Sequence, residues 1–320
     1  MIITNQSVEL LKHDKHPYEF IEQVARTCYK SEDKITPGSA VKMVQGLVKS
    51  KHLAMIEHEY LYYWLDQGEM ERFVSDNDPE DLRYINVTPR YVSGSFRAFY
   101  ELFHTAYYLP INVMMKFLAQ IKYPEVFGES AHIKYPEVFG DTGRGDISEI
   151  LPFVSLVDRE EILDCCMEED IMKLIPHTFK FITNRGISHE LVRHRPIAAA
   201  MESQRYVDYG QDKRGNQITV IHPHIHETDI DNYNNWHYCM LMCETQYMNL
   251  RKSGIPAEIA RGVLPNDCKT EIVITATEEE WQHIVNLRYH GTTGRPHPQM
   301  YELMSMAFPV LQEESNKRIM

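Results

Sequence analysis

The segment from His189 to Tyr206 constrains the fold more than any other part of the chain. Within eighteen residues it holds three arginines, two histidines, two carboxylates and a serine. A core segment seldom buries so many polar groups, and a disordered segment seldom carries so much apolar sequence between them. Arginines clustered in this way are typical of a site for a planar or tetrahedral anion, because the guanidinium group offers paired donors and keeps its charge. The alternative is a solvated helix face with local ion pairs.

The overall charge supports a small anionic ligand. The chain has 320 residues and a net charge of −13, whereas residues 185–214 hold six basic and four acidic side chains. We therefore expect no general nucleic-acid binding, which requires a basic face. We also expect no membrane segment, because no apolar run approaches the roughly 18 residues that span a bilayer. The six cysteines form no paired Cys-x-x-Cys spacing, which favours a reduced, cytoplasmic protein.

The histidines do not predict a metal site. His189 and His194 are five residues apart, which places them roughly 140° out of line on a helix, whereas a zinc-protease helix needs a spacing of four. His222, His224 and His226 would share one side of an extended segment and could bind a metal. Because Pro223 interrupts that segment and no cysteine lies near it, a surface turn is the favoured interpretation.

Local patterns predict both helices and strands. Helices are expected over 17–30, 38–51, 159–175, 229–252 and 281–288. Strands are expected over 57–65, 179–183, 218–221 and 270–275, where aromatic and β-branched residues gather. The stretch 121–128 recurs word for word as 133–140, and we interpret it as a duplication inside a surface insertion.

The order of the central motif resembles a known signature. Arg193-His194-Arg195, then Ser203 after seven residues, then Arg205-Tyr206, is similar to the signature of the flavin-dependent thymidylate synthases. The segments 185–192, 255–265 and 297–303 resemble the same family. The resemblance runs from about 17 to 310, apart from insertions near 105–160 and 206–217. It implies one domain over 1–320 with an α+β fold, a mostly antiparallel sheet flanked by helices.

The resemblance also implies an activity. Family members methylate dUMP to dTMP, taking the one-carbon unit from methylenetetrahydrofolate and a hydride from reduced FAD, which NADPH regenerates. They assemble as homotetramers with shared active sites. The implied site takes the Arg-His-Arg and Ser203 side from one subunit, and the Arg261 and Arg288 side from another. Two alternatives stay open: an enzyme acting on another pyrimidine nucleotide or adding another one-carbon group, and an inactive homologue that binds nucleotide or flavin.

Site residues follow from the matched motifs. The resemblance assigns the nucleotide to Glu190, Arg193, Glu202, Ser203, Gln204, Arg205, Arg261 and Arg288. It assigns the flavin to Ala54, Arg193, His194, Arg195, Thr277, Glu279 and His283. The chain lacks Gly-x-Gly-x-x-Gly, so no Rossmann motif binds the flavin.

Arg288 is the expected catalytic residue. It lies on the apolar side of a predicted amphipathic helix and therefore needs an anionic partner, such as a uracil ring that has lost its N3 proton. Six positions depart from the family pattern. Ala198, Ala200 and Met201 stand where the longer family members typically have two serines and a glutamine. Ala54 replaces a hydroxyl residue, and Thr277 and Glu279 replace the Asn and Arg of an Asn-x-Arg motif that contacts the flavin.

Overall fold

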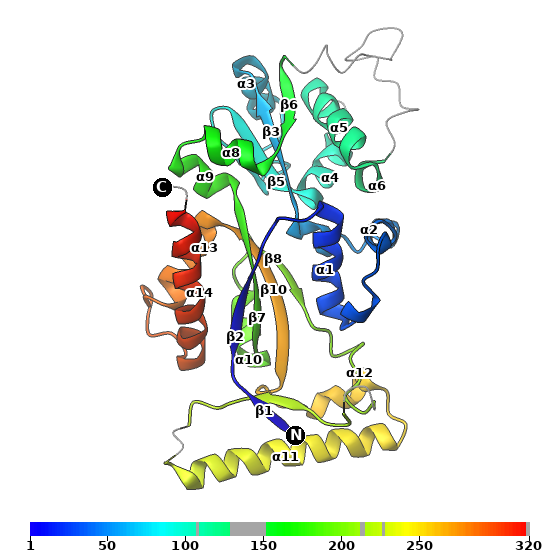
Figure 1. Ribbon diagram of the computed structural model, residues 1–320, viewed down its shortest axis with the longest axis vertical. Coiled ribbons are helices and arrows are strands. Elements are labelled where there is room, and N and C mark those ends of the chain that lie inside the picture. Colours follow the sequence, from blue (N-terminus) through cyan, green and yellow to red (C-terminus); the bar gives the residue numbers. More distant parts are fainter. Residues whose placement is uncertain (107–108, 129–151, 212–214, 226–227, 318–320) are drawn as a thin grey trace.

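Two antiparallel sheets of four strands each lie one above the other along the long axis of the molecule (Figure 1). The computed structural model describes residues 1–106, 109–128, 152–211, 215–225 and 228–317. Both sheets carry helices, which confirms the expected α+β class with antiparallel pairing.

The lower sheet has the strand order β2-β7-β10-β8. Its strands are β2 (Ser7–Leu11), β7 (Pro176–Asn184), β10 (Lys269–Thr277) and β8 (Ala198–Met201). β7 and β10 pair over nine residues, from Asn184 opposite Lys269 to Pro176 opposite Thr277. Because alternate side chains point to opposite faces, Phe181 and Ile272 face one layer of helices while Val273 and Ala200 face another.

The first face is covered by three helices. They are α10 (Arg185–Leu191), α13 (Glu278–Arg288) and α14 (Pro298–Asn316). Trp281 is fully buried against Phe179, and its ring nitrogen donates a hydrogen bond to the carbonyl of His177. This contact fixes α13 on the sheet and so determines which way the end of α13 points.

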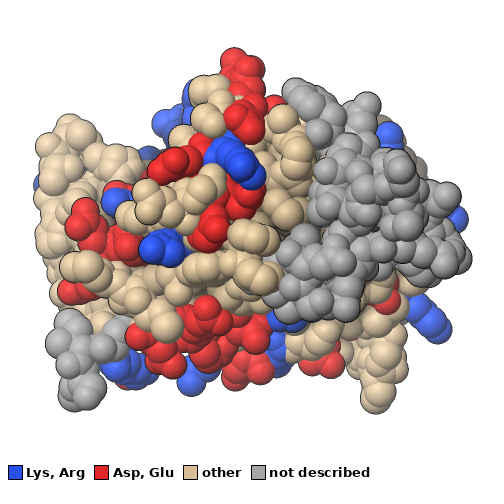
Figure 2. Space-filling view, turned by 90° about the horizontal axis from the view of Figure 1, so that it is seen from above, with Lys and Arg blue, Asp and Glu red and all other residues tan. Residues whose placement is uncertain are grey.

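The second face packs on α1 (Pro17–Tyr29) and shares a hydrophobic core with the upper sheet. The upper sheet has the order β4-β5-β3-β6, with β4 (Ile85–Val87), β5 (Tyr91–Ser95), β3 (Tyr60–Leu65) and β6 (Val154–Val157). The helices of this region are α2 (Ser39–Lys49), α3 (Gln67–Asp76), α4 (Phe96–Thr105), α5 (Pro110–Lys122), α6 (Pro124–Phe127), α8 (Arg159–Cys165) and α9 (Glu168–Leu174), with a 3-10 helix at Leu53–His58. Acidic side chains form several patches on the face seen from this end, with fewer basic side chains among them (Figure 2).

A third, smaller unit crosses the bottom of the molecule (Figure 1). β1 (Ile2–Thr4) pairs in parallel with β9 (Thr219–Ile221), and the long helix α11 (Ile230–Lys252) runs beneath them. The short α12 (Ala257–Ala260) and a 3-10 turn at Arg261–Val263 follow α11. None of the helices in the described parts of the chain is both long and apolar enough to span a bilayer.

Most predicted elements are present, with three corrections. The predicted strand at 57–65 begins only at Tyr60, because the residues before it form the 3-10 helix. The predicted helix at 159–175 is two helices, because the backbone is extended at Cys166 and Met167. The first copy of the repeat is not confined to the surface, as that interpretation implied, since Phe127 is only 6% exposed in the core. Whether the segment is an insertion stays a prediction. The second copy, at 133–140, lies outside the described residues.

Candidate functional site

Arg288 lies at the end of α13 and contacts the segment that follows α10. Its Nη1 donates to Glu190 Oε2 at 3.2 Å, and its Nη2 donates to the Glu190 carbonyl at 3.3 Å. Its Nε donates to His194 Nε2 at 3.2 Å. The side chain is 23% exposed. The predicted anionic partner therefore exists within the chain as Glu190, and the contacts among described residues use three of the five guanidinium N–H groups.

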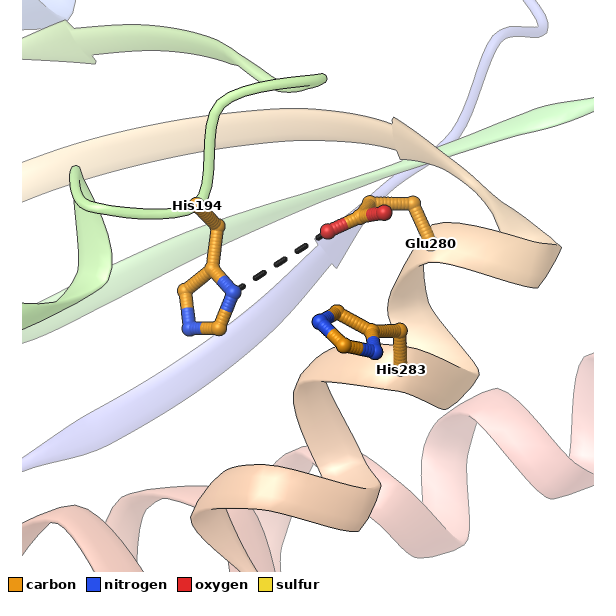
Figure 3. Close-up of side chains that lie close together, drawn as sticks. All are labelled: His194, Glu280 and His283. Carbon is orange, nitrogen blue, oxygen red and sulfur yellow. Dashed lines mark ion pairs between the residues drawn. The ribbon is translucent and has the colours of Figure 1, made fainter. Parts of the chain in front are cut away.

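His194 joins a cluster of three side chains beside Arg288. Figure 3 shows His194 facing Glu280 and His283, which project from one side of α13. His194 Nδ1 is 3.9 Å from Glu280 Oε1, and the rings of His194 and His283 meet edge to face with centroids 6.1 Å apart. Burial, together with the neighbouring positive charges of Arg288 and His283, lowers the pKa of His194 to about 4. His194 is therefore neutral at pH 7.

The start of α13 explains this arrangement. The Thr277 side chain accepts a hydrogen bond from the Glu280 backbone and so caps the helix. Glu280 and His283 are three residues apart, which places them on the same helical face. Burial raises the pKa of Glu280, and the charge of Glu279 adds to that rise while His283 opposes it.

A pocket of about 240 Å³ opens between the two sheets. It is lined by Glu57, Tyr60, Arg83, Tyr84, Asn86, Ser95, Arg97, Ala98, Glu101, Arg195, Pro196, Ile197, Ala198 and Thr277. Two of the residues assigned to flavin, Arg195 and Thr277, are thus neighbours in one pocket.

The charges in this pocket favour an anion. Arg97 is neutralised by ion pairs with Glu57 at 2.5 Å and Glu101 at 2.7 Å. Arg195 has no ion pair with an acidic side chain in the part of the chain that the structure describes, and Arg83 lies over the ring of Tyr84. Because Arg97 pairs with two carboxylates, the three arginines and two glutamates that line the pocket leave a net charge of one positive, which suits a phosphate group.

The other residues assigned to flavin are arranged differently. His194 and His283 meet in the cluster beside Arg288, while Arg193 and Glu279 are exposed. Glu279 is not among the residues that line the pocket, so its reversed charge does not lie against a ligand there. Ala54 lies in the 3-10 helix and packs against the hydrophobic core.

Several residues assigned to the nucleotide lie on the opposite face of the lower sheet. Glu202 is 3% exposed, and it pairs with Lys269 at 3.3 Å and accepts a hydrogen bond from Tyr209. Gln204 is also buried, with its amide near the sulfur of Cys268. The structure therefore gives Glu202 and Gln204 structural contacts within the chain.

Lys269 is the centre of a buried charge cluster that sequence reasoning missed. It contacts Glu271 at 2.5 Å as well as Glu202. Lys30 and Lys180 also pair with Glu271. Burial acts to raise the pKa of Glu271, but Lys269 and Lys30 hold it down at about 2.

Ser203, Arg205 and Arg261 lie near this face, away from Arg288. The Ser203 backbone donates to the carbonyl of Cys28 at the end of α1. Arg205 and Arg261 are exposed, and Arg205 reaches Glu258 on α12 at 3.9 Å. The resemblance assigns Arg288 and the Arg-His-Arg motif to different subunits, whereas in this chain Arg288 contacts His194 and Glu190 of its own chain. The division of the site between subunits stays a prediction.

Sequence reasoning also missed Glu280. Its spacing from His283, three residues apart on a predicted helix, was a usable signal. No signal in the sequence indicated that His194 approaches this pair, because His194 is 86 positions from Glu280 and comes close to it only in the folded chain.

Comparison with known proteins identifies the lineage of this site. Residues 158–313 match the family model described as "Thymidylate synthase complementing protein". The flavin-dependent thymidylate synthase of Geobacter sulfurreducens is 32% identical over 146 residues, which are 44% of this chain and 61% of that protein. The enzyme of the same name from Pyrococcus furiosus is 27% identical over 150 residues, 47% of this chain and 58% of that protein.

One solved structure overlaps along nearly the whole chain. A UMP/dUMP methylase, PolB from Streptomyces cacaoi, bound with 5-Br dUMP, covers 98% of this chain and 96% of its own, at 15% identity and a TM-score of 0.41. At this TM-score the agreement of the two folds is slight. The chain spans less than two thirds of the length of the relatives it matches in sequence, and the matched part contains Glu190, His194 and Arg288. This chain is a distant homologue of the flavin-dependent thymidylate synthase family over about half of its length.

Proposed function

We propose that this protein is a flavin-dependent methyltransferase that converts dUMP to dTMP. Methylenetetrahydrofolate would supply the one-carbon unit, and NADPH would reduce the bound FAD. The observation that carries the proposal is the Arg288 guanidinium, held by Glu190 and His194 in the part of the chain that matches the family.

Arg288 would activate the uracil ring. Carbon C5 becomes nucleophilic when electron density moves onto the ring, and a fixed cation beside a ring oxygen favours the anion formed by loss of the N3 proton. The two N–H groups left over from the contacts to Glu190 and His194 are enough for one such oxygen. Glu190 keeps the guanidinium in place, so its orientation is set before the nucleotide binds.

The cysteines support this route over attack by a thiolate. Burial raises the pKa of Cys28 and of Cys268 to about 12, so both thiols stay protonated. The remaining cysteines lie in or beside α8 and in α11, away from Arg288. A nucleophilic cysteine is thus not placed to add to C6 of a ring at Arg288.

The pocket between the sheets fits part of a flavin nucleotide. Arg83 and Arg195, which form no ion pair with another residue that the structure describes, suit a diphosphate, and Tyr60 and Tyr84 offer aromatic surface for a planar ring. Bound FAD, once reduced by NADPH, would supply the hydride. The chain's contribution would be to bind the diphosphate at Arg195 and to present neutral His194 and His283 towards the ring system.

The nucleotide site would be completed by a second subunit. Arg288 and Arg193 would come from one chain, and Ser203, Arg205 and Arg261 from its neighbour. Arg288 contacts Glu190 in α10, whereas Ser203 contacts the end of α1 on the opposite face of the lower sheet. Symmetric homo-oligomers commonly build sites at a repeated interface. We accordingly propose a homotetramer. The single-domain organisation over 1–320 also stays a proposal.

The substrate is the part of the proposal with a specific alternative. Ala198, Ala200 and Met201 stand where the family has polar residues, which favours testing other pyrimidine nucleotides. The protein should be incubated with FAD, NADPH, methylenetetrahydrofolate and either dUMP or dCMP, and the products identified by mass. Conversion of dUMP to dTMP supports the proposal. Methylation of dCMP but not of dUMP would support the alternative, an enzyme that acts on another pyrimidine nucleotide. The absence of a methylated product from both nucleotides would contradict both functions.

A further inference from the structure

We propose that His194, Glu280 and His283 form a binding site for a first-row divalent transition metal ion, with Zn²⁺ as the typical occupant. One ligand atom from each of these residues lies within 4.8 Å of the other two. Two imidazoles and one carboxylate, with positions left open for water, are a recurrent set for such ions. The proposed methylation chemistry does not require a metal, and a metal bound here would compete with the flavin for His194 and His283.

The three side chains can approach a metal with small movements. Zinc bonds of about 2.0–2.1 Å place tetrahedral ligand atoms about 3.3 Å apart, so each side chain must shift by roughly 1 Å or less. Glu280 and His283 are anchored one helical turn apart on α13 and already share a face (Figure 3). His283 is exposed and can adjust its rotamer freely. His194 is the fixed member, since its side chain is only 5% exposed.

The protonation states suit coordination. Burial and the neighbouring Arg288 lower the pKa of His194 to about 4, so one of its ring nitrogens offers a lone pair at neutral pH. Burial raises the pKa of Glu280, which means that its negative charge is poorly solvated there. A cation bound between the three groups would relieve that desolvation.

Arg288 opposes metal binding, so the proposal predicts how metal affinity changes when Arg288 is replaced. Its Nε donates to His194 Nε2, which places the ring proton on Nδ1, the nitrogen that faces Glu280. Coordination through Nδ1 requires that proton to move to Nε2 and the hydrogen bond from Arg288 to break. Arg288 keeps its contacts to Glu190 when this happens. Replacing Arg288 should consequently strengthen metal binding, because a competing cation and a competing hydrogen bond are both removed.

The test uses Co²⁺ and Zn²⁺ with the full chain after dialysis against a chelator. Visible d–d absorption reports Co²⁺ coordination, and equilibrium dialysis gives the Zn²⁺ stoichiometry. The variants are His283→Ala, Glu280→Gln and Arg288→Met. His224→Ala is the matched control, since His224 is also an exposed histidine paired with a glutamate, Glu302 at 2.9 Å. Thermal unfolding confirms that each variant is folded.

We expect one metal ion per chain in the wild type. His283→Ala and Glu280→Gln should each lower the affinity more than about 100-fold, beyond the 10–100-fold that loss of a ligand's hydrogen-bonding partner produces. Arg288→Met should raise the affinity at least about tenfold, and His224→Ala should leave it unchanged. The proposal is overturned if no saturable ion binds, if His283→Ala binds as the wild type does, or if the signal disappears in His224→Ala instead.

Discussion

Replacing Lys269 by Met should destabilise the protein strongly at neutral pH and much less in acid. The ammonium group of Lys269 lies between Glu202 and Glu271, which are 3% and 9% exposed. Methionine preserves the packing of the aliphatic part of the side chain. It removes one of the positive charges that compensate the two buried carboxylates.

The pKa of Glu271 provides the magnitude. Lys269 and Lys30, against the opposing effect of burial, hold this pKa at about 2 rather than the ordinary 4.5. At about 1.4 kcal/mol per pH unit the whole shift corresponds to roughly 3.5 kcal/mol of stability as an upper bound. Lys269 supplies the largest favourable share, and Glu202 loses a partner as well. We therefore expect a loss of about 2–3 kcal/mol at pH 7.

The pH dependence follows from the direction of the shift. A carboxylate with a lowered pKa stabilises the folded state above pH 4.5, and this contribution disappears as the pH falls towards 2. The gap between wild type and Lys269→Met should thus narrow steadily over that range. Urea unfolding followed by circular dichroism at pH 7, 4.5 and 3 measures the gap.

The control for this experiment is Lys317→Met, which removes an exposed lysine that pairs with Glu313 and Glu314. It should leave the free energy of unfolding nearly unchanged at every pH, as exposed ion pairs usually do. The reasoning is refuted if Lys269→Met is as stable as the wild type at pH 7, or if its deficit is the same at pH 3.

Three further predictions concern the site and the fold. Arg288→Lys keeps the charge but loses the planar fork, so turnover of dUMP should fall about 100- to 1000-fold while nucleotide affinity changes far less; turnover within a few-fold of the wild type would exclude Arg288 as the activating group. Arg288→Ala and Arg205→Ala proteins should each be inactive alone. Mixed oligomers of these two variants, verified by mass spectrometry, should regain part of the activity. Mixed oligomers of Arg288→Ala and Arg193→Ala should stay inactive. Activity in the second mixture, or none in the first, would contradict the division of the site between subunits. Phe127→Ala should reduce the free energy of unfolding by about 3–5 kcal/mol. Ile121→Ala, at a residue that is 48% exposed, should leave it almost unchanged. Equal stabilities of the two variants would place the first copy of the repeat at the surface.

Local sequence patterns predicted elements better than they predicted the arrangement of elements. The helix at 17–29 and the one ending at Arg288 follow from apolar spacing and capping residues, which act over a few positions. Gly94 shows the limit. It lies in β5, where a Cβ atom would come within 2.8 Å of Ile85 on the neighbouring strand. Such a close approach depends on strand pairing, which local patterns do not reveal.

For the site, too, the sequence predicted local features but not the contacts between distant segments. The sequence indicated that Arg288 needs an anionic partner, and the structure supplies Glu190, 98 residues away. No periodicity could have linked them. Glu202 was assigned to the nucleotide by resemblance, yet the structure buries it against Lys269, a residue with no motif of its own. The motif locates the chemistry in the sequence, while tertiary contacts decide which of its side chains are free to bind a ligand.

The central claim is that this chain carries flavin chemistry directed at dUMP. The most direct measurement is the visible spectrum of the purified protein with FAD under anaerobic conditions, before and after NADPH, and again after dUMP and methylenetetrahydrofolate. We predict a bound-flavin spectrum that NADPH bleaches and that returns as dTMP forms. A protein that stays colourless and gives no calorimetric heat with FAD would contradict the account, because Arg195 and the pocket around it would then not bind the cofactor.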